Sequence, residues 1–325
     1  MPWRGRFEMT IAKTIAIDLG GTQVRAALCE GPRILVRASK KTDLAGGPTD
    51  IVKQFESLID EVSAGADRGD IAGVGLSSAG PVDTELGIVL GIPTIPGWEN
   101  IPICTLLSNR VGLPVHLEND AIAAALGEWR HGAGQGLQNM VYLTVSTGIG
   151  GGAVVDGRLL HGRKGMAAHV GHMRLAQEGP RCKCGAVACF EAFASGTALA
   201  ERARAAGEAD PAGFLGLTLK NKSIGALQVF EGAREGDPQC RLLVDQEAAY
   251  LGQGITSIIH AFSPEQVVLG GGLSHSFDLL EAGIHAVIAA DAMAPFKQVR
   301  VVPSMLGDNS GLVGAATMAL ERAGS

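Results

Sequence analysis

Residues 13–30 read KTIAIDLGGTQVRAALCE: an apolar run, a glycine turn at 19–22 and a second stretch of alternating apolar residues. This pattern is typical of a buried strand that turns back on itself. The same order returns in residues 140–155, MVYLTVSTGIGGGAVV, with a glycine turn at 146–152. A strand, a glycine turn and another strand that occur twice predict two related halves, which face each other across a cleft.

The rest of the chain alternates predicted strands with predicted helices, which implies an α/β fold with largely parallel sheets. We expect a small N-terminal α/β domain in residues 1–119 plus 307–325. A larger domain in residues 120–306 would carry a cysteine-rich loop. The further predicted strands lie at 33–38, 71–77, 115–117, 153–160, 266–269 and 299–302, and a Gly/Pro-rich loop at 87–100. The predicted helices lie at 48–64, 101–110, 120–130, 195–206, 222–235, 238–261, 276–290 and 309–322.

Length and composition limit the possible classes of protein. The 325 residues suffice for two domains, and a hydrophobic content of 46% with only 18% charged residues suits buried sheets. The net charge of −6, without a basic stripe, argues against a nucleic-acid partner. No apolar run reaches membrane-spanning length, and the first nine residues, MPWRGRFEM, lack the apolar core of a secretory signal. We therefore expect a cytoplasmic protein without a membrane partner.

Three of the six cysteines fall within eight residues, at Cys182, Cys184 and Cys189, and His172 stands ten positions before the first of them. Thiolate and imidazole are the ligands that a tetrahedral zinc ion prefers, and these four groups would fill its coordination sphere. The alternative is a set of buried or disulfide-bonded cysteines, but a Cys-x-Cys pair cannot close on itself without strain. We expect a structural zinc that shapes a loop and does not attack a substrate.

The two glycine turns suit the binding of phosphates. In DLGGT, residues 18–22, glycines let backbone N–H groups approach a phosphate, and Asp18 at the strand end is placed to hold Mg²⁺. STGIGGG, residues 146–152, is the matching turn, and two such turns predict a clamp for a nucleotide. An ordinary glycine turn is the alternative for each. Residues 270–272, GGG, offer a surface for adenine or ribose, and a helix-entry turn explains them equally well.

Glu118, Asn119 and Asp120 follow the predicted strand 115–117 at the mouth of the proposed cleft. A carboxylate there can take the proton from a substrate hydroxyl as this attacks a γ-phosphoryl group, while Mg²⁺ and loop amides hold the transferring charge. The amide of Asn119 can hold sugar hydroxyls. An ordinary helix cap at Asn119 or Asp120 is the competing interpretation.

These motifs in this order resemble the ROK family of sugar kinases, over nearly the whole chain from Thr14 to Ala319. The resemblance implies two actin/hexokinase-like (ribonuclease H-like) α/β domains, ATP with Mg²⁺, a structural Zn²⁺ and a homodimer or homotetramer. Its motifs are DLGGT (18–22) and STGIGGG (146–152) for phosphate, LENDAIAAALGE (117–128) for the catalytic base, and GH (171–172), CKCG (182–185) and CFEAFASG (189–196) for zinc.

The resemblance also implies roles for single residues. Asp120 would be the catalytic base, and Glu191 would accept a sugar hydroxyl. His172 would have two tasks, because one ring nitrogen can bind zinc while the other faces the sugar. The implied metal ligands are His172, Cys182, Cys184 and Cys189; the sugar-binding residues are Gly80, Asn119, Asp120, His169, His172 and Glu191; the nucleotide-binding residues are Asp18, Gly20, Gly21, Thr22, Thr147, Gly148, Gly150, Gly271 and Gly272.

Three positions depart from the family pattern. His169 stands where most family kinases have a glutamate that binds the sugar near C1 and C2, and in this it resembles bacterial N-acetylmannosamine kinases. An imidazole can donate as well as accept, so the preferred group at C2 should change. Ala188 replaces the last glycine of the cysteine motif, and a positive φ there would strain the loop by ~1 kcal/mol. Thr94 replaces an asparagine found in many glucokinases.

We therefore predict an ATP-dependent kinase that phosphorylates O6 of a hexose, with N-acetylmannosamine favoured by His169. Glucose or another hexose is the alternative. A sugar sensor or scaffold without catalysis is the alternative from another class. Such a protein would be expected to lose its base or its phosphate loops, yet Asp18, Gly20, Gly21 and Asp120 are all present.

Overall fold

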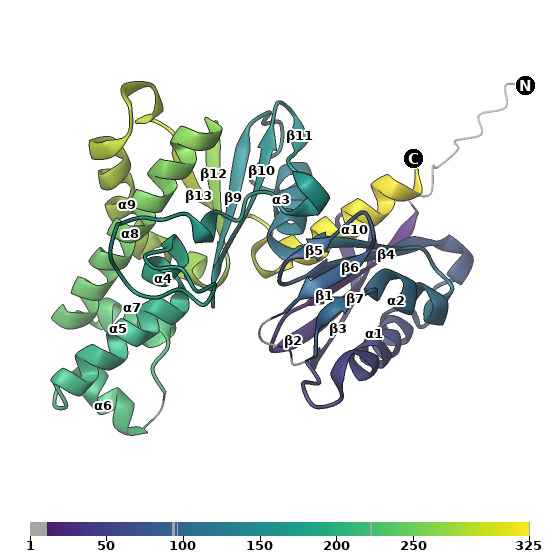
Figure 1. Ribbon diagram of the computed structural model, residues 1–325, viewed down its shortest axis with the longest axis horizontal. Coiled ribbons are helices and arrows are strands. Elements are labelled where there is room, and N and C mark those ends of the chain that lie inside the picture. Colours follow the sequence, from purple (N-terminus) through teal and green to yellow (C-terminus); the bar gives the residue numbers. More distant parts are fainter. Residues whose placement is uncertain (1–11, 93–94, 96, 222, 325) are drawn as a thin grey trace, which may run out of the picture. The chain divides into compact units, whose positions relative to one another are not determined.

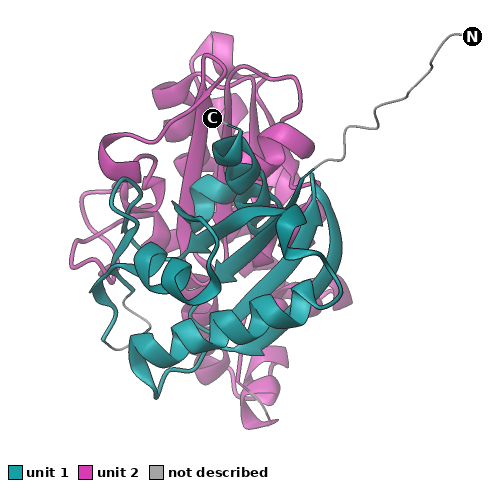
Figure 2. Cartoon of the chain, turned by 90° about the vertical axis from the view of Figure 1, so that its right-hand side faces the viewer, with its two compact units in different colours: residues 1–123, 311–325 teal, residues 124–310 magenta. Residues whose placement is uncertain are grey.

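The computed structural model describes residues 12–92, 95, 97–221 and 223–324. The first nine residues and Thr94, on which two expectations depend, lie outside these ranges. The chain forms two compact units: unit 1 is residues 1–123 with 311–325, and unit 2 is residues 124–310 (Figure 2). Each unit has its own sheet and its own hydrophobic core.

The sheet of unit 1 is built around its first strand, which is apolar on both faces. Ile15 and Ile17 point into the larger core of the unit, and Ala16 between them points to the opposite face. The first strand pairs antiparallel with the second and parallel with the fourth. The strands β1 (Lys13–Leu19), β2 (Gln23–Glu30), β3 (Arg33–Lys41), β4 (Ile71–Ser78) and β8 (Val115–Asn119) follow the order β3-β2-β1-β4-β8 (Figure 1).

Helices cover both faces of this sheet. Two helices, α1 (Gly47–Ser63) and α2 (Ile103–Val111), pack on the face that Ile15 and Ile17 share. The C-terminal helix, α10 (Ser310–Ala323), packs on the Ala16 face through Leu312, Ala315 and Ala316. A Cβ at Gly75 in β4 would lie 1.9 Å from the carbonyl oxygen of Ala315, so only glycine lets α10 approach the sheet this closely.

The Gly/Pro-rich segment that was expected to be a loop holds a small antiparallel sheet, so this prediction was wrong. Its strands are β5 (Val82–Asp83), β6 (Ile88–Gly91) and β7 (Glu99–Ile101), paired in that order. Val89 in the middle strand is fully buried and opposite Ile101, which gives the sheet a reason to form despite its glycines and prolines.

The sheet of unit 2 repeats the arrangement of the first. Its strands are β9 (Met140–Val145), β10 (Ile149–Val155), β11 (Arg158–Leu159), β12 (Gln266–Gly270) and β13 (Arg300–Pro303), in the order β11-β10-β9-β12-β13. The hairpin is antiparallel and the last two strands are parallel to β9, as in unit 1. The predicted α/β fold with two related halves is confirmed.

The second glycine turn is shorter than predicted, because Gly150, Gly151 and Gly152 lie inside β10 and pair with β9. A neighbouring segment explains glycines in a strand. A Cβ at Gly151 would lie 2.7 Å from the side chain of Val170, and a Cβ at Gly171 would lie 2.1 Å from the carbonyl oxygen of Ile149. These glycines therefore let a short 3₁₀ turn, η3 (Val170–His172), lie directly on the strand.

Helices form the rest of unit 2. The longest, α8, has 25 residues and begins after Asp237, whose carboxylate caps the backbone N–H of Cys240. Two helices, α4 and α6, were not predicted, and α7 begins four residues later than the start expected at 222. The helices are α4 (Phe190–Ala194), α5 (Gly196–Ala209), α6 (Phe214–Asn221), α7 (Ala226–Glu235), α8 (Pro238–Phe262) and α9 (Phe277–Asp291).

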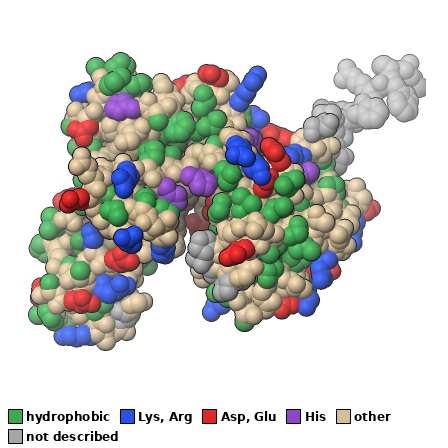
Figure 3. Space-filling model, in the orientation of Figure 1, with side chains coloured by type: hydrophobic (Ala, Val, Ile, Leu, Met, Phe, Trp, Pro, Cys, Tyr) green, Lys and Arg blue, Asp and Glu red, His purple; other side chains and the backbone are tan. Residues whose placement is uncertain are grey.

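The chain passes between the units inside two helices. The first passage lies within α3 (Asp120–His131), between Ala123 and Ala124, and the return lies between Ser310 and Gly311 at the start of α10. On the surface, positive and negative side chains are interspersed (Figure 3). Among the helices within the described ranges, none is both long and apolar enough to cross a bilayer.

Candidate active site and metal centre

Asp18 is held at the end of β1 by two partners. Arg25, its cross-strand neighbour in β2, donates from Nε to Oδ2 at 3.0 Å and also from Nη2. The hydroxyl of Ser77 in β4 donates to the other carboxylate oxygen at 2.9 Å. The sequence interpretation missed Arg25 and Ser77, although hairpin register places Arg25 directly opposite Asp18. The carboxylate that was predicted to hold Mg²⁺ is thus fixed by a cation and a hydroxyl.

Asn119 and Asp120 begin helix α3, and the helix cap falls on Asn119. Its amide oxygen accepts from the backbone N–H groups of Ala121, at 3.0 Å, and Ile122, at 3.3 Å. Its amide nitrogen donates to the carbonyl oxygen of Gly80 at 3.2 Å. Asn119 and Gly80, both predicted to bind sugar, therefore meet in unit 1, and Asp120 is not needed as the cap.

Burial, and after it the negative charge of Asp18, raise the pKa of Asp120 to about 6. Three hydrogen bonds oppose the shift: one from the backbone N–H of Ala121, one from the side chain of Asn119 and one from the backbone of Asp120 itself. A carboxylate with such a pKa is still mainly ionised at neutral pH and is a stronger base than an ordinary aspartate. These are the properties that a general base needs.

The first glycine turn is closed by its own backbone. The N–H of Gly20 donates to the carbonyl oxygen of Gln23 at 3.0 Å. Thr42, directly after β3, donates from its hydroxyl to the carbonyl oxygen of Gly20 at 2.7 Å and from its N–H to that of Thr22 at 3.0 Å. Thr22 is exposed, as a residue that contacts a phosphate must be.

The second glycine turn is held from outside. Glu191, in the short helix α4, accepts the backbone N–H of Ile149 on Oε2 at 2.8 Å. A Cβ at Gly148 would lie 2.4 Å from that same oxygen, so glycine is required for the carboxylate to reach the turn. Two further bonds come from the start of α5: the N–H of Gly196 to Ser146, and the hydroxyl of Thr197 to Thr147, both at 2.7 Å.

Gly271 lies beside the second turn. Its φ is +80°, and a Cβ there would lie 2.5 Å from the carbonyl oxygen of Val145. Gly271 and Gly272 therefore adjoin the turn that carries Thr147 and Gly148 in unit 2, while Gly150 pairs inside β10. The predicted nucleotide-binding residues of this half are brought together, apart from Gly150, which is part of the strand.

His172, Cys182, Cys184 and Cys189 offer ligand atoms that all lie within 4.8 Å of one another. The Sγ of Cys182 is 3.7 Å from Nδ1 of His172, and the Sγ atoms of Cys184 and Cys189 are also 3.7 Å apart. Ligands around a tetrahedral zinc are separated by about 3.5–3.8 Å, so the four residues fit that ion. All six cysteines are free thiols, which removes the disulfide alternative.

The chemistry of the donor set supports a metal in the same way. Burial raises the pKa of the Cys182 thiol to about 12, so a metal that takes it as thiolate would release a proton. Nδ1 of His172 faces the thiols, which leaves its Nε2 for a second partner. Glu191 lies close by, with Oε1 3.8 Å from the Sγ of Cys182 and Oε2 accepting from the second glycine turn, so its carboxylate contacts both the cysteine cluster and the turn.

Ala188 has a φ of +61°, the left-handed conformation that the missing glycine of the motif suggested. This costs a non-glycine residue about 1–2 kcal/mol. The methyl group is fully buried, which compensates for part of that cost. The cluster is thus compatible with alanine at this position.

His169 is exposed, and its ring centroid lies 6.4 Å from that of His172. Its Nδ1 lies 3.3 Å from the carbonyl oxygen of Ala167, which is the distance of a weak hydrogen bond. Ala168, directly before it, has a φ of +57°. The two imidazole rings are therefore neighbours at the η3 segment.

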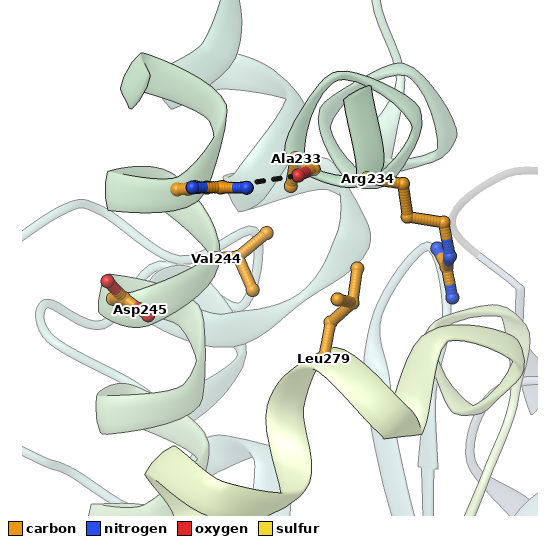
Figure 4. A pocket seen from close by; sticks show the side chains of 6 residues that line it. Ala233, Arg234, Val244, Asp245 and Leu279 are labelled. Atoms are coloured by element: carbon orange, nitrogen blue, oxygen red, sulfur yellow. Dashed lines mark hydrogen bonds between the residues drawn. The ribbon is translucent and has the colours of Figure 1, made fainter. Parts of the chain in front are cut away.

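A separate depression of about 450 Å³ lies between α7, α8 and α9 in unit 2. Figure 4 shows its lining, in which Arg241 donates to the carbonyl oxygen of Ala233 at 3.4 Å and Val244 and Leu279 face each other. Arg234 at its edge pairs with Asp278. None of the residues predicted to bind sugar, nucleotide or metal lines it.

Comparison with known proteins agrees with these motifs. The family model described as "ROK family" matches residues 14–322. The chain belongs to the ROK family. A glucokinase of Thermotoga maritima is 36% identical over 315 residues, which cover 96% of this chain and 98% of that protein. An N-acetylmannosamine kinase of Salmonella agona is 34% identical over 307 residues, 94% and 98% of the two chains.

Among solved structures, a ROK family glucokinase from Streptomyces griseus in complex with glucose and AMPPNP superimposes with a TM-score of 0.84. It is 35% identical, and the match covers 95% of this chain and 99% of that one. The predicted ROK-family sugar kinase and its actin/hexokinase-like fold are therefore confirmed.

Proposed function

We propose that this ROK-family kinase transfers the γ-phosphoryl group of ATP to O6 of glucose, with Asp120 as the general base. The observation that carries the proposal lies inside unit 1. Burial and the nearby negative charge of Asp18 raise the pKa of Asp120 to about 6. One carboxylate thus has the pKa of a general base, while the other forms an ion pair with Arg25.

The proposed roles follow from the chemistry of phosphoryl transfer. Asp120 accepts the proton of the attacking hydroxyl, and the backbone N–H groups of the two glycine turns hold the phosphates. Mg²⁺, held by Asp18, would neutralise charge on the phosphates when it is bound with ATP. Asn119, with Gly80 behind it, and Glu191 with Nε2 of His172 are proposed to hold sugar hydroxyls.

Zinc is proposed as a structural ion on His172, Cys182, Cys184 and Cys189. Four protein ligands leave no open position, so the ion would not activate a substrate. Its task would be to fix His172 and, through the loop, Glu191. Metal analysis of the purified protein tests this, with about one zinc per chain expected and a metal-free active protein contradicting it.

Glucose is proposed first because the T. maritima relative, at 36% identity, is a glucokinase, as is the S. griseus structure. N-acetylmannosamine is the second candidate, and His169 is the observation that favours it, since an imidazole can donate to an acetamido oxygen. An N-acetylmannosamine kinase at 34% identity supports this alternative almost as well.

A coupled assay over glucose, N-acetylmannosamine, N-acetylglucosamine, fructose and allose decides between these sugars. We expect glucose to have the highest kcat/KM. A preference of tenfold or more for N-acetylmannosamine would replace the first proposal by the second. Sugar binding without any consumption of ATP would instead establish a sensor.

His169→Glu tests whether this residue selects the sugar. If it does, the ratio of kcat/KM for glucose and N-acetylmannosamine should rise by about tenfold, the effect of one hydrogen bond to a sugar group. The matched control is His161→Glu, which places the same charge elsewhere in the same loop. An equal ratio in both variants would remove His169 from the pocket.

The proposed homodimer or homotetramer stays a prediction. Light scattering coupled to size-exclusion chromatography measures it directly.

A further inference from the structure

Glu128, in the C-terminal half of α3, is a fully buried carboxylate with an unusual number of hydrogen bonds. It accepts five, and all five donors are neutral groups. The donors to Oε1 are the hydroxyls of Ser304 and Ser310, the latter at 2.8 Å, and the N–H of Leu306 at 2.9 Å; those to Oε2 are the N–H groups of Ala133 at 2.9 Å and Met305 at 3.2 Å.

The surrounding chain is shaped to admit this carboxylate. A Cβ at Gly132 would lie 2.1 Å from Oε2, so any other residue there would displace it. The segment 304–310 winds around the same point: the N–H of Gly307 donates to the hydroxyl of Ser304 at 2.8 Å, and the backbone N–H of Ser310 donates to the carbonyl oxygen of Gly307. A buried charge requires such complete satisfaction, and any variant that breaks the set leaves donors unpaired.

The position of Glu128 along the chain gives these bonds a further meaning. The chain leaves unit 1 within α3, four residues before Glu128, and returns directly after Ser310, one of the five donors. The two passages between the units are therefore joined by one carboxylate, on the unit 2 side.

The same two passages end at the two carboxylates of unit 1. Helix α3 begins with Asp120. The chain returns to unit 1 at Gly311, in the first turn of α10, and a Cβ at Gly311 would lie 3.5 Å from Oδ1 of Asp18. Thus α3 begins at Asp120, and the start of α10 lies beside Asp18. Glu128 joins α3 to the segment that leads into α10 through its hydrogen bonds.

We propose that Glu128 is a positioning residue: by joining α3 to the segment that starts α10, it fixes Asp120 relative to Asp18. The inference rests on the proposed function in so far as Asp120 is the base. In this proposal Glu128 contacts neither the sugar nor ATP, but it determines the positions of Asp120 and Asp18, which are proposed to act on them. Displacements of about 1 Å in such a constellation cost on the order of 10²-fold in rate.

Glu128→Gln is the test variant, because it keeps the shape and replaces one acceptor oxygen by an NH₂ group that repels the donors. Two quantities are measured: kcat at saturating sugar and ATP, and the titration of the Asp120 carboxyl by NMR on ¹³C-labelled aspartate, assigned with Asp120→Asn. We expect kcat to fall by about 10²-fold. We expect the pKa of Asp120 to fall by about 0.5 unit or more, since both Asp18 and burial raise it and both depend on position.

The matched control is Glu247→Gln, another fully buried carboxylate of unit 2, which pairs with Arg202 and lies in α8. It should lower stability but leave the titration of Asp120 unchanged. If Glu128→Gln also loses only stability, with kcat and the titration as in the wild type, the residue is merely structural and the inference is overturned.

If Glu128→Gln does not fold, Ser310→Ala takes its place, since it removes a single donor and should move the titration in the same direction by less. A titration unmoved in Ser310→Ala then overturns the inference. The NMR measurement also separates this inference from the proposed function. A wild-type protein that phosphorylates no sugar refutes the kinase proposal, but Asp120 still titrates, and its dependence on Glu128 is still measured.

Discussion

The two hairpins of the molecule, residues 13–30 in unit 1 and 140–155 in unit 2, share their strand order and differ in what holds the turn. In the first hairpin the second cross-strand pair from the turn is charged, Asp18 with Arg25. In the second hairpin the corresponding pair is Thr144 with Gly150, which has no charge to offer. There the turn is instead held by Glu191 from outside the hairpin.

This difference implies that the two turns are stabilised independently of each other. The first turn carries its own acidic group and supports itself. The second turn depends on a helix that begins one residue after Cys189, a proposed metal ligand. A defect in the cysteine loop should therefore disturb the second turn and spare the first. The following predictions test that independence, beginning with the largest effect.

Asp120→Asn should have the largest effect on catalysis, because it removes the proposed base next to the first hairpin. We expect kcat to fall by about 10³-fold, within the range of general-base contributions. Sugar affinity, measured by calorimetry, should change little, since an amide keeps the size and the polarity of the side chain. A variant that retains more than a tenth of wild-type kcat would show that Asp120 is not the base.

Removal of the metal should damage the second hairpin alone. After chelation we expect kcat/KM for the sugar to fall by about 10–100-fold, because His172 and Glu191 lose their support. Hydrogen exchange is the informative measurement: the N–H of Ile149, bonded to Glu191, should lose protection, while that of Gly20 should keep it. Equal loss at both sites would contradict the independence of the two turns.

The pH dependence of kcat/KM should reflect the ionisation of Asp120, which lies near the first hairpin. The base must be ionised, so kcat/KM should fall as the pH drops through about 6, by about tenfold per pH unit below it. Stability should follow the opposite trend. The folded-state pKa of Asp120 lies above the ordinary value of 3.8, so the folded protein binds the proton more tightly, and stability is lost as pH rises from 3.8 through about 6.

Asp120→Asn is therefore expected to be more stable than the wild type at pH 7, and this gain should vanish below pH 4. Thermal unfolding at both pH values measures it. A variant less stable than the wild type at pH 7 would show that the charge of Asp120 is better compensated than its surroundings indicate.

We expect the smallest effect on kcat/KM when a single methyl group is added to each glycine turn in separate variants. Gly148→Ala puts a Cβ 2.4 Å from Oε2 of Glu191, which must then move, whereas Gly20→Ala meets only the carbonyl oxygen of Gln23 at 3.1 Å. We expect kcat/KM to fall by about tenfold in the first variant and by less than about threefold in the second, the loss of one hydrogen bond against a small adjustment. The reverse order would mean that the first turn is the more tightly constrained.

The sequence predicted most of the fold because its strands are short, apolar and separated by clear helical periods. It failed where a tertiary contact overrides the local pattern. Glycines 150–152 look like a turn, yet they pair with β9, and at Gly151 the missing side chain leaves room for Val170 of the η3 turn. The segment 87–100 looks like a loop, but Val89 opposite Ile101 makes it a sheet. Helix α6, eight residues long, is too short for its periodicity to stand out.

The sequence predicted which residues form the candidate site, but not the neighbouring residues that hold them in position. Ligand chemistry and spacing suffice for the cysteine cluster, and strand ends suffice for Asp18 and Asn119. Arg25 is read as an ordinary alternating residue until the register places it opposite Asp18. Four of the five donors to Glu128 lie 176 to 182 residues away from it in the chain, and no local pattern connects them.

The split composition of unit 1 has a consequence for how the protein is made. Unit 2 is one continuous piece, residues 124–310, and all of it leaves the ribosome before helix α10 does. The sheet of unit 1 is synthesised first but keeps its Ala16 face bare until Leu312, Ala315 and Ala316 arrive to cover it. The half of the enzyme that is translated earliest is thus the last to be finished, and ribosomes that stall in the final helix release a chain whose oldest sheet is uncovered.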